Sequence, residues 1–300
     1  MLKIAWSPAY CHPLPQEHRF PMRKYDMLPR LLRQKGLAGD DNFFEPQPLD
    51  EATALLTHTP EYWRHLTQLT LPPAAVRRTG FPLSEQLVLR ERIITQGTVD
   101  YALYALQYGA AFNIAGGTHH AFAGSGDAYC LMNDCAVAAN YLLHTGRTRH
   151  ILIIDLDAHQ GQGTAHIFKN SEQVFTFSMH SSDNYPLKKE ESKLDIALPL
   201  HCSGTHYLQL LEEALNKLKH LPADLVFYIA GVDVLATDAL GRLGLSMADC
   251  RQRDRMVYTF CRSRQLPVVT TMGGGYSKDI NTIVEAHCGT FEEAIKVMDL

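Results

Sequence analysis

The chain has 300 residues, of which 46% are hydrophobic and 20% charged, as in a folded globular protein. Its 28 Lys and Arg against 32 Asp and Glu give a formal net charge of −4, which provides no basic excess for binding a polyanion, so no nucleic-acid partner is expected. Seven cysteines without a C-x-x-C pair, no signal segment before Pro8, and a longest apolar stretch (225–235) interrupted by Asp233 indicate a cytoplasmic protein without a membrane span. The oligomeric state is left open.

Apolar runs of strand length alternate with amphipathic runs of helical length along the chain. The predicted strands are residues 3–6, 111–115, 151–155, 174–179, 225–230 and 267–272. The predicted helices include residues 25–35, 85–108, 134–144, 203–218 and 246–264. This alternation predicts an α/β protein with a parallel sheet covered by helices on both faces. Since no linker or repeat divides the chain, we expect residues 1–300 to form a single domain.

Chemically active residues follow five of the predicted strands. The motifs are GGTHH after residue 115, DLDAHQGQG from residue 155, His180, GVD from residue 231, and GGGY from residue 273. Ligands bind at the carboxyl ends of strands in open parallel sheets. The shared position of these motifs predicts one site at that edge.

Asp157, His159 and Asp233 are the candidate metal ligands. Two carboxylates and an imidazole beside buried strands are costly unless they bind something, and oxygen and nitrogen ligands of this kind are typical of zinc. Three protein ligands also leave a position open for water or substrate. The alternatives are a capped strand end with a hydrogen-bonded Asp pair for the first segment and a helix N-cap for Asp233.

His119, His120 and Tyr276 are the candidate catalytic groups. The two histidines follow a strand and a glycine pair, where general acid–base catalysis competes with a plain polar loop. Tyr276 follows three glycines, so its phenol could donate a hydrogen bond to a developing oxyanion. The alternative is a flexible or phosphate-binding glycine loop, but GGGY lacks the Lys of a P-loop.

Together these segments resemble the histone deacetylase family of zinc amidohydrolases. GGTHHA, YCLMND, IDLDAHQGQG, FSMH, AGVDVLATDALGRLGLS and GGGY occur in the family's order over most of the chain. The form DAHQGxG is similar to class IV members and their bacterial relatives. The resemblance implies an arginase-like deacetylase fold and metal-dependent hydrolysis of an N-acyl amide, typically on a lysine side chain.

The resemblance also implies a role for each matching residue. Asp157, His159 and Asp233 match the zinc ligands; His119 and His120 match the histidine pair, with His120 favoured as the general base. Tyr276 matches the tyrosine that stabilises the transition state. Asp155 matches the carboxylate that orients His119.

Potassium binding is a further implication of the resemblance. The matching groups for one potassium ion are Asp155, the carbonyls of Asp157, His159 and Met179, and the hydroxyl of Ser178. A second potassium site would lie at Phe168, Ser171 and Val174.

Two departures from the family pattern affect catalysis and specificity. Gln162 stands where many relatives have an Asp beside the second histidine, and an amide stabilises an imidazolium less than a carboxylate does, so His120 should be a weaker base. The two aromatic channel walls, often phenylalanines, are matched by Tyr129 and Tyr185, with Gly274 as a further channel residue. Hydroxyl groups there leave the acyl preference open.

The arginases share this fold, but a dimanganese site needs D-A-H-x-D, and Gly161 occupies the last position of that pattern. One catalytic metal is therefore predicted, and zinc and ferrous iron both accept this ligand set. The leading hypothesis is removal of acetyl or longer acyl groups from lysines of a protein or peptide. The alternatives are hydrolysis of a small acylated amine, polyamine or metabolite amide, and a non-catalytic acyl-group binder.

Overall fold

A computed structural model describes residues 2–300 of the chain. Within these residues eight strands form one sheet, every neighbouring pair is parallel, and the order is β2-β1-β3-β8-β7-β4-β5-β6. The strands are β1 (Ile4–Ala5), β2 (Phe43–Phe44), β3 (Ala110–Asn113), β4 (Ile151–Asp155), β5 (Val174–Ser181), β6 (Leu194–Leu198), β7 (Leu225–Ile229) and β8 (Val268–Thr271).

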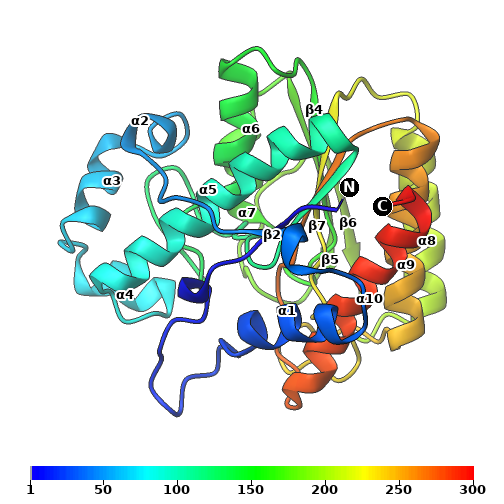
Figure 1. Ribbon diagram of the computed structural model, residues 1–300, viewed down its shortest axis with the longest axis horizontal. Helices are drawn as coiled ribbons and strands as arrows, with labels where there is room; N and C mark the ends of the chain where they lie inside the picture. The colour runs from blue at the N-terminus through cyan, green and yellow to red at the C-terminus, as the bar shows by residue number, and fades with distance from the viewer. Residues whose placement is uncertain (1) are drawn as a thin grey trace.

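Helices cover both faces of this sheet (Figure 1). They are α1 (Lys24–Gln34), α2 (Glu51–Ala54), α3 (Pro60–Thr67), α4 (Pro73–Thr79), α5 (Glu85–Tyr108), α6 (Asp134–His144), α7 (Gln162–Phe168), α8 (Gly204–Leu218), α9 (Met247–Ser263) and α10 (Ile280–Met298). Helices α8, α9 and α10 pack together on one face, and α5 packs with α6 on the other. The predicted α/β architecture is confirmed.

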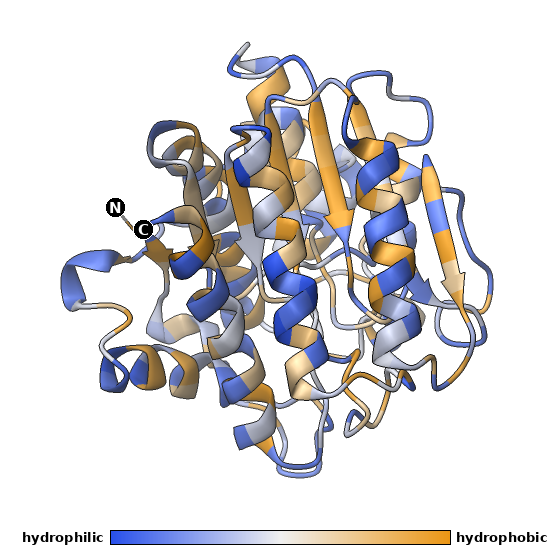
Figure 2. Cartoon of the chain, turned by 90° about the vertical axis from the view of Figure 1, so that its right-hand side faces the viewer, coloured by the Kyte–Doolittle hydropathy of each residue, from blue (hydrophilic) through white to orange (hydrophobic). Residues whose placement is uncertain are grey.

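The hydrophobic core lies on both faces of the central strands. Every residue of β4 and of β7 is buried, which is expected for parallel strands covered on both faces. Figure 2 shows strands of the sheet as mostly hydrophobic segments behind helices that carry many hydrophilic residues. In α8 the buried residues recur at helical spacing, and each fully buried leucine there contributes roughly 1.5–3 kcal/mol. They are Gly204, Tyr207, Leu211, Ala214, Leu215 and Leu218.

The predicted helix boundaries agree closely where a capping residue is present. Ser84 caps α5 through its side chain, and α5 ends before Gly109, whose φ is 90°. Ser246 and Asp249 form the capping box that begins α9. Each cap satisfies backbone N–H groups that have no partner inside the helix, so the residue type fixes where the helix starts.

Two of the strands, β2 and β6, are not among the predicted ones. β2 has only two residues, and β6 lies at the sheet edge with alternating burial. Neither therefore has the continuous apolar run that identifies the central strands. Among residues 2–300, no helix is both long enough and apolar enough to cross a membrane.

The strand order places all five sequence motifs on one side of the molecule. The strands that precede them (β3, β8, β7, β4 and β5) are consecutive neighbours in the sheet. Because all of them run parallel, the loops at their carboxyl ends meet at a single edge. The topology thus assembles the site that the motifs predict.

Candidate metal and catalytic site

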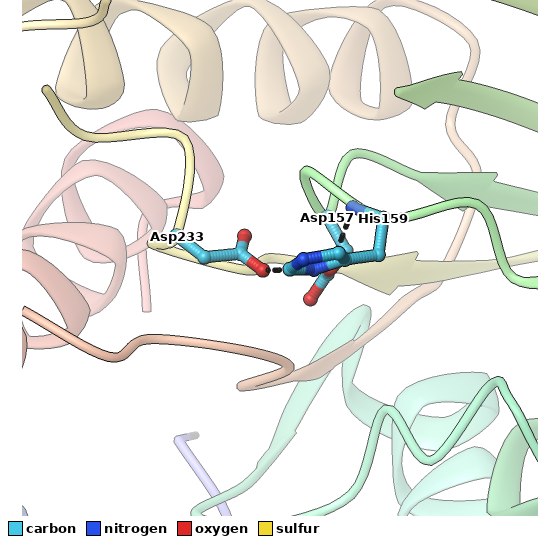
Figure 3. Close-up of side chains that lie close together, drawn as sticks. All are labelled: Asp157, His159 and Asp233. Atoms are coloured by element: carbon cyan, nitrogen blue, oxygen red, sulfur yellow. Dashed lines mark hydrogen bonds and ion pairs between the residues drawn. The ribbon is translucent and has the colours of Figure 1, made fainter. Parts of the chain in front are cut away.

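Three buried side chains meet where β4 and β7 end. The Nδ1 atom of His159 lies 3.2 Å from Asp157 Oδ1 and 2.9 Å from Asp233 Oδ2. One ligand atom from each residue lies within 4.8 Å of the others. Figure 3 shows the three side chains pointing toward one another from two loops, Asp157 and His159 from one and Asp233 from the other. Tetrahedral bonds of zinc length place neighbouring ligand atoms about 3.3 Å apart, so this spacing fits a single divalent ion.

The electrostatics of the three residues also favour a cation. Burial, reinforced by repulsion from Asp157, raises the pKa of Asp233 to about 7. Burial lowers the pKa of His159, but the hydrogen bonds to Asp157 and Asp233 outweigh it and raise the pKa to about 10. In the protein alone an imidazolium thus balances the carboxylate charge. A divalent ion would supply that charge instead, with the histidine neutral.

Backbone amides hold the two carboxylates in place. Ala158 N–H donates to Asp233 Oδ1 at 2.9 Å, and Gly274 N–H donates to Asp157 Oδ2 at 2.7 Å. A Cβ atom on Gly274 would lie 2.4 Å from Asp233 Oδ2, so a side chain there would displace a ligand. Gly274 therefore lies directly against the carboxylates of Asp157 and Asp233.

Arg253, on α9, connects the loop after β4 with the loop after β7. It is fully buried, and its Nη1 donates to the carbonyls of Gly231 at 2.5 Å and Leu156 at 3.3 Å. Its charge is paired with Asp254 at 2.8 Å. Leu156 directly precedes one ligand, and Gly231 comes two residues before another. Sequence reasoning missed this residue because an arginine inside a polar helix segment is usually exposed.

The histidine pair lies beside the ligand cluster. His119 Nδ1 is 2.6 Å from Asp155 Oδ2, and His119 Nε2 is 3.2 Å from His120 Nε2. Burial lowers the pKa of His119, but Asp155 and Asp157 outweigh it and raise the pKa to about 9. Burial and the neighbouring His119 hold the pKa of His120 well below its ordinary value. The environment therefore keeps His119 charged and His120 neutral, the division that acid–base catalysis uses.

Two residues at the start of α6 fix the loop that carries the histidines. The carboxylate of Asp134 accepts from the backbone N–H groups of Gly117 and Thr118. The Asn133 amide donates to the carbonyl of Ala121 at 3.0 Å. Asn133 also caps α6, so the helix and the catalytic loop share one anchor. Both residues belong to the YCLMND segment, where the sequence suggested no individual role for them.

Tyr276 is held by groups on both sides. Its backbone N–H donates to Asp238 Oδ2 at 2.5 Å, and the ammonium of Lys24 lies 5.8 Å from its ring centroid. Lys24 also donates to the carbonyl of Gly273 at 3.2 Å. Burial, followed by Asp157, raises the pKa of the Tyr276 phenol well above its ordinary value. The phenol therefore stays protonated and can act as a hydrogen-bond donor.

A cavity of about 200 Å³ leads from the surface to these groups. Tyr129, Tyr185 and Tyr276 line it, with His120 and His159 at its inner end and Arg242 toward the outside. A smaller space of about 40 Å³ continues past the metal ligands to Tyr25 and Arg90. Both tyrosines predicted as channel walls thus border the cavity. Arg242 and Arg90 were not predicted, because Arg90 lies outside the motifs and the motif AGVDVLATDALGRLGLS suggested no individual role for Arg242.

The residues matched to potassium ligands fall into two groups. Ser178 of β5 pairs in register with Asp155 of β4, beneath the metal site, and Met179 follows it on the strand. The Ser178 hydroxyl lies 2.9 Å from His180 Nδ1. At the other end of the sheet, a turn joins Phe168, Ser171 and Val174. There, Ser171 N–H donates to Phe168 O at 3.0 Å, and Val174 N–H donates to Ser171 Oγ at 3.1 Å.

Comparisons with known proteins cover nearly the whole chain. The family described as "Histone deacetylase domain" matches residues 18–291. An uncharacterized protein of Picosynechococcus is 42% identical over 95% of both chains. Histone deacetylase 2 of Arabidopsis thaliana is 28% identical over 89% of this chain and 72% of its own. The crystal structure of a histone deacetylase homologue from Aquifex aeolicus superposes with a TM-score of 0.84 at 25% identity, covering 99% of this chain and 88% of that one.

The family match extends over the loops that form the site as well as over strands β2 to β8. The similarity to the Aquifex homologue extends over both layers of helices, because it covers 99% of this chain. The resemblance inferred from short motifs is therefore confirmed along the chain. This protein belongs to the histone deacetylase family.

Proposed function

We propose that this protein is a metal-dependent amidohydrolase that removes acetyl or longer acyl groups from lysine side chains. Residues 1–300 would act as one catalytic domain. The observation that carries the proposal is the cluster of three candidate metal ligands, a charged and a neutral histidine, and a protonated phenol, of which His120, His159 and Tyr276 line the cavity.

Asp157, His159 and Asp233 would hold the catalytic ion, and zinc or ferrous iron suits this ligand set. When bound, such an ion would polarise the amide carbonyl and lower the pKa of water. Asp155 and Ser178, with the neighbouring backbone carbonyls, would hold potassium below this site. The second potassium would lie at the turn formed by Phe168, Ser171 and Val174.

The remaining steps use groups of the chain itself. His120 Nε2 accepts the proton of the water that attacks the amide carbon. The Tyr276 hydroxyl donates a hydrogen bond to the carbonyl oxygen as negative charge develops there. His120 then returns a proton to the departing amine. His119, kept positive by Asp155, stabilises the negative charge but has no free nitrogen lone pair with which to accept a proton.

The shape of the cavity favours a linear amine. The walls formed by Tyr129 and Tyr185 leave a passage that suits an unbranched methylene chain, and apolar contact with both rings would hold that chain. In the proposed binding mode, a lysine side chain would extend to the inner groups while its backbone remained at the surface. This supports a peptide or protein substrate over a compact metabolite amide.

The experiment is a panel of fluorogenic acyl-lysine peptides of increasing acyl length, assayed beside acetylated polyamines. Tyr276→Phe serves as the inactive variant. Tyr141→Phe, on α6 away from the cavity, is the matched control. Hydrolysis of acyl-lysines that needs Tyr276 but not Tyr141 supports the proposal. A kcat/KM that is higher for polyamines than for every peptide would contradict the substrate assignment.

A further inference from the structure

The amide of Gln162 has two chemically different ends, and both face polar groups. Its Oε1 lies 2.6 Å from His120 Nδ1. On the other side, its Nε2 lies 3.5 Å from Asp127 Oδ2 and 3.5 Å from the Tyr185 hydroxyl. Gln162 is buried, so these neighbours must satisfy the amide in place of bulk water.

The position of Asp127 is fixed by its backbone. Asp127 N–H donates to Cys130 O at 2.8 Å, and Cys130 N–H donates back to Asp127 O at 2.8 Å. Between them Ala128 and Tyr129 both adopt positive φ, at 38° and 66°. Tyr129 N–H is anchored in turn to the carbonyl of Thr79 at 2.7 Å. The carboxylate of Asp127 is therefore presented to Gln162 by a tight turn with little freedom to move.

The charge of Asp127 distinguishes the two orientations of the amide. In the observed orientation the Gln162 NH2 group faces the carboxylate, which is an acceptor only. Rotating the amide by 180° would bring Oε1 against that carboxylate and turn the NH2 toward His120. Two acceptors in contact repel each other, so the rotated orientation is disfavoured.

We propose that Asp127 is a positioning residue that orients the Gln162 amide and thereby fixes the tautomer of His120. With Oε1 facing it, His120 must carry its hydrogen on Nδ1, which leaves the lone pair on Nε2. That atom lies 3.2 Å from His119 Nε2. Asp127 thus supplies, through one intervening amide, the orienting effect that a carboxylate in direct contact would give.

The consequence for catalysis rests on the proposed function, in which His120 Nε2 accepts the proton. The opposite tautomer would place a hydrogen on Nε2 and could not act as a base there. Tyr185 stands beside the same amide, and its ring packs edge-on to that of His120 at 5.2 Å between centroids. The Tyr185 hydroxyl also hydrogen-bonds with Asp127, and a carboxylate can only accept, so Asp127 directs the phenol hydrogen away from Gln162 as well.

The test is the tautomer of His120 in the zinc-loaded protein, read from two-bond 1H–15N correlations of the imidazole nitrogens. The signals of His120 are those that disappear in His120→Gln. The wild type should show a protonated Nδ1 and an unprotonated Nε2. Asp127→Asn keeps the shape of the side chain but can turn either an oxygen or an NH2 group toward Gln162. The Gln162 amide can then take either orientation, so both tautomers of His120 should appear. In that variant kcat should fall by about twofold, with a smaller change in KM, because about half the molecules lose the competent form.

Asp183→Asn is the matched control, because exposed Asp183 lies two residues from Tyr185 and pairs with Ser182 rather than with Gln162. It should leave the tautomer unchanged, as should Tyr185→Phe. Adding Gln162→Glu to Asp127→Asn should restore the Nδ1 hydrogen, since a carboxylate accepts in every orientation. A purely structural role for Asp127 would not be rescued in this way.

A single Nδ1-protonated tautomer in folded Asp127→Asn would overturn the proposal, as would an Nε2-protonated ring in the wild type. The tautomer is measured without substrate. A protein that hydrolyses no acyl-lysine but shows the expected tautomers would therefore refute the proposed function and leave this inference standing.

Discussion

Protonation of His58 should loosen the loop that carries the catalytic histidines. His58 is buried, its Nε2 accepts the backbone N–H of Asn133 at 3.1 Å, and its Nδ1 lies 3.2 Å from Ala123 O. Burial lowers its pKa from 6.5 to about 4. A proton on Nε2 would remove the acceptor for Asn133, whose side chain holds the carbonyl of Ala121 beyond the histidine pair.

The sign and size of the effect follow from linkage. The folded-state pKa of His58 is depressed, so the unfolded state binds more protons between the two pKa values and stability falls as the pH drops through this range. The pKa of His58 is 6.5 in the unfolded state and about 4 in the folded state. Acidification from pH 7 to pH 5 therefore lowers the unfolding free energy by about 2 kcal/mol through His58. Most of this loss of unfolding free energy occurs below pH 6.5, the pKa of His58 in the unfolded state.

The assay is urea denaturation at both pH values for the wild type, His58→Gln and His220→Gln. Glutamine cannot titrate, so His58→Gln should lose about 2 kcal/mol less than the wild type on acidification. His220 is exposed, so its variant should behave as the wild type does. Equal acid losses in the wild type and His58→Gln would refute the reasoning, because the buried imidazole would then contribute nothing to the pH dependence.

Three further predictions concern the site. Tyr276→Phe should retain its metal and lower kcat by roughly two to three orders of magnitude, the usual cost of one oxyanion donor; a near-normal rate would exclude the phenol from that role. Gln162→Asp should raise the pKa of His120 and shift the acidic limb of kcat/KM to higher pH, with metal occupancy checked at each point; an unmoved limb would mean that His120 does not control it. Arg253→Met should weaken zinc retention in chelator competition, because the loops that it joins carry the ligands; unchanged zinc affinity in the folded variant would contradict that role.

The parts of the fold that were predicted are those with a local physical signal. The apolar runs of β4 and β7 and the helical stretches of α5 and α9 each depend on a few neighbouring residues. Short or edge strands such as β2 and β6 depend on a partner strand that is distant in sequence. Their apolar content is too small to reveal them without that partner.

The residues of the site also fall into those with a local sequence signal and those without one. Asp157, His159, Asp233, the histidine pair and Tyr276 stand in motifs at strand ends, and parallel topology brings strand ends together. The supporting groups were not predicted, because helix and loop packing creates their contacts. They are Lys24, His58, Asp127, Asn133, Asp134 and Arg253.

The roles assigned by resemblance remain predictions after the structure is known, as does the class IV-like assignment. The geometry brings Asp155 to His119, and Gln162 to His120, as the matching positions require. It also places Tyr129 and Tyr185 on the cavity. The register of β4 with β5 brings Asp155 beside Ser178, but this register is a property of the sheet and does not identify an ion.

The most direct test of the proposed function is a zinc titration of the metal-free protein, followed by hydrolysis of an acetyl-lysine peptide. The rate should be absent without metal, rise linearly, and saturate at one equivalent of zinc. Asp233→Asn should show no such saturation at the same concentrations, because the site would lack one ligand charge. Full activity of the rigorously metal-free protein, or saturation only at two equivalents, would contradict a single ion held by Asp157, His159 and Asp233.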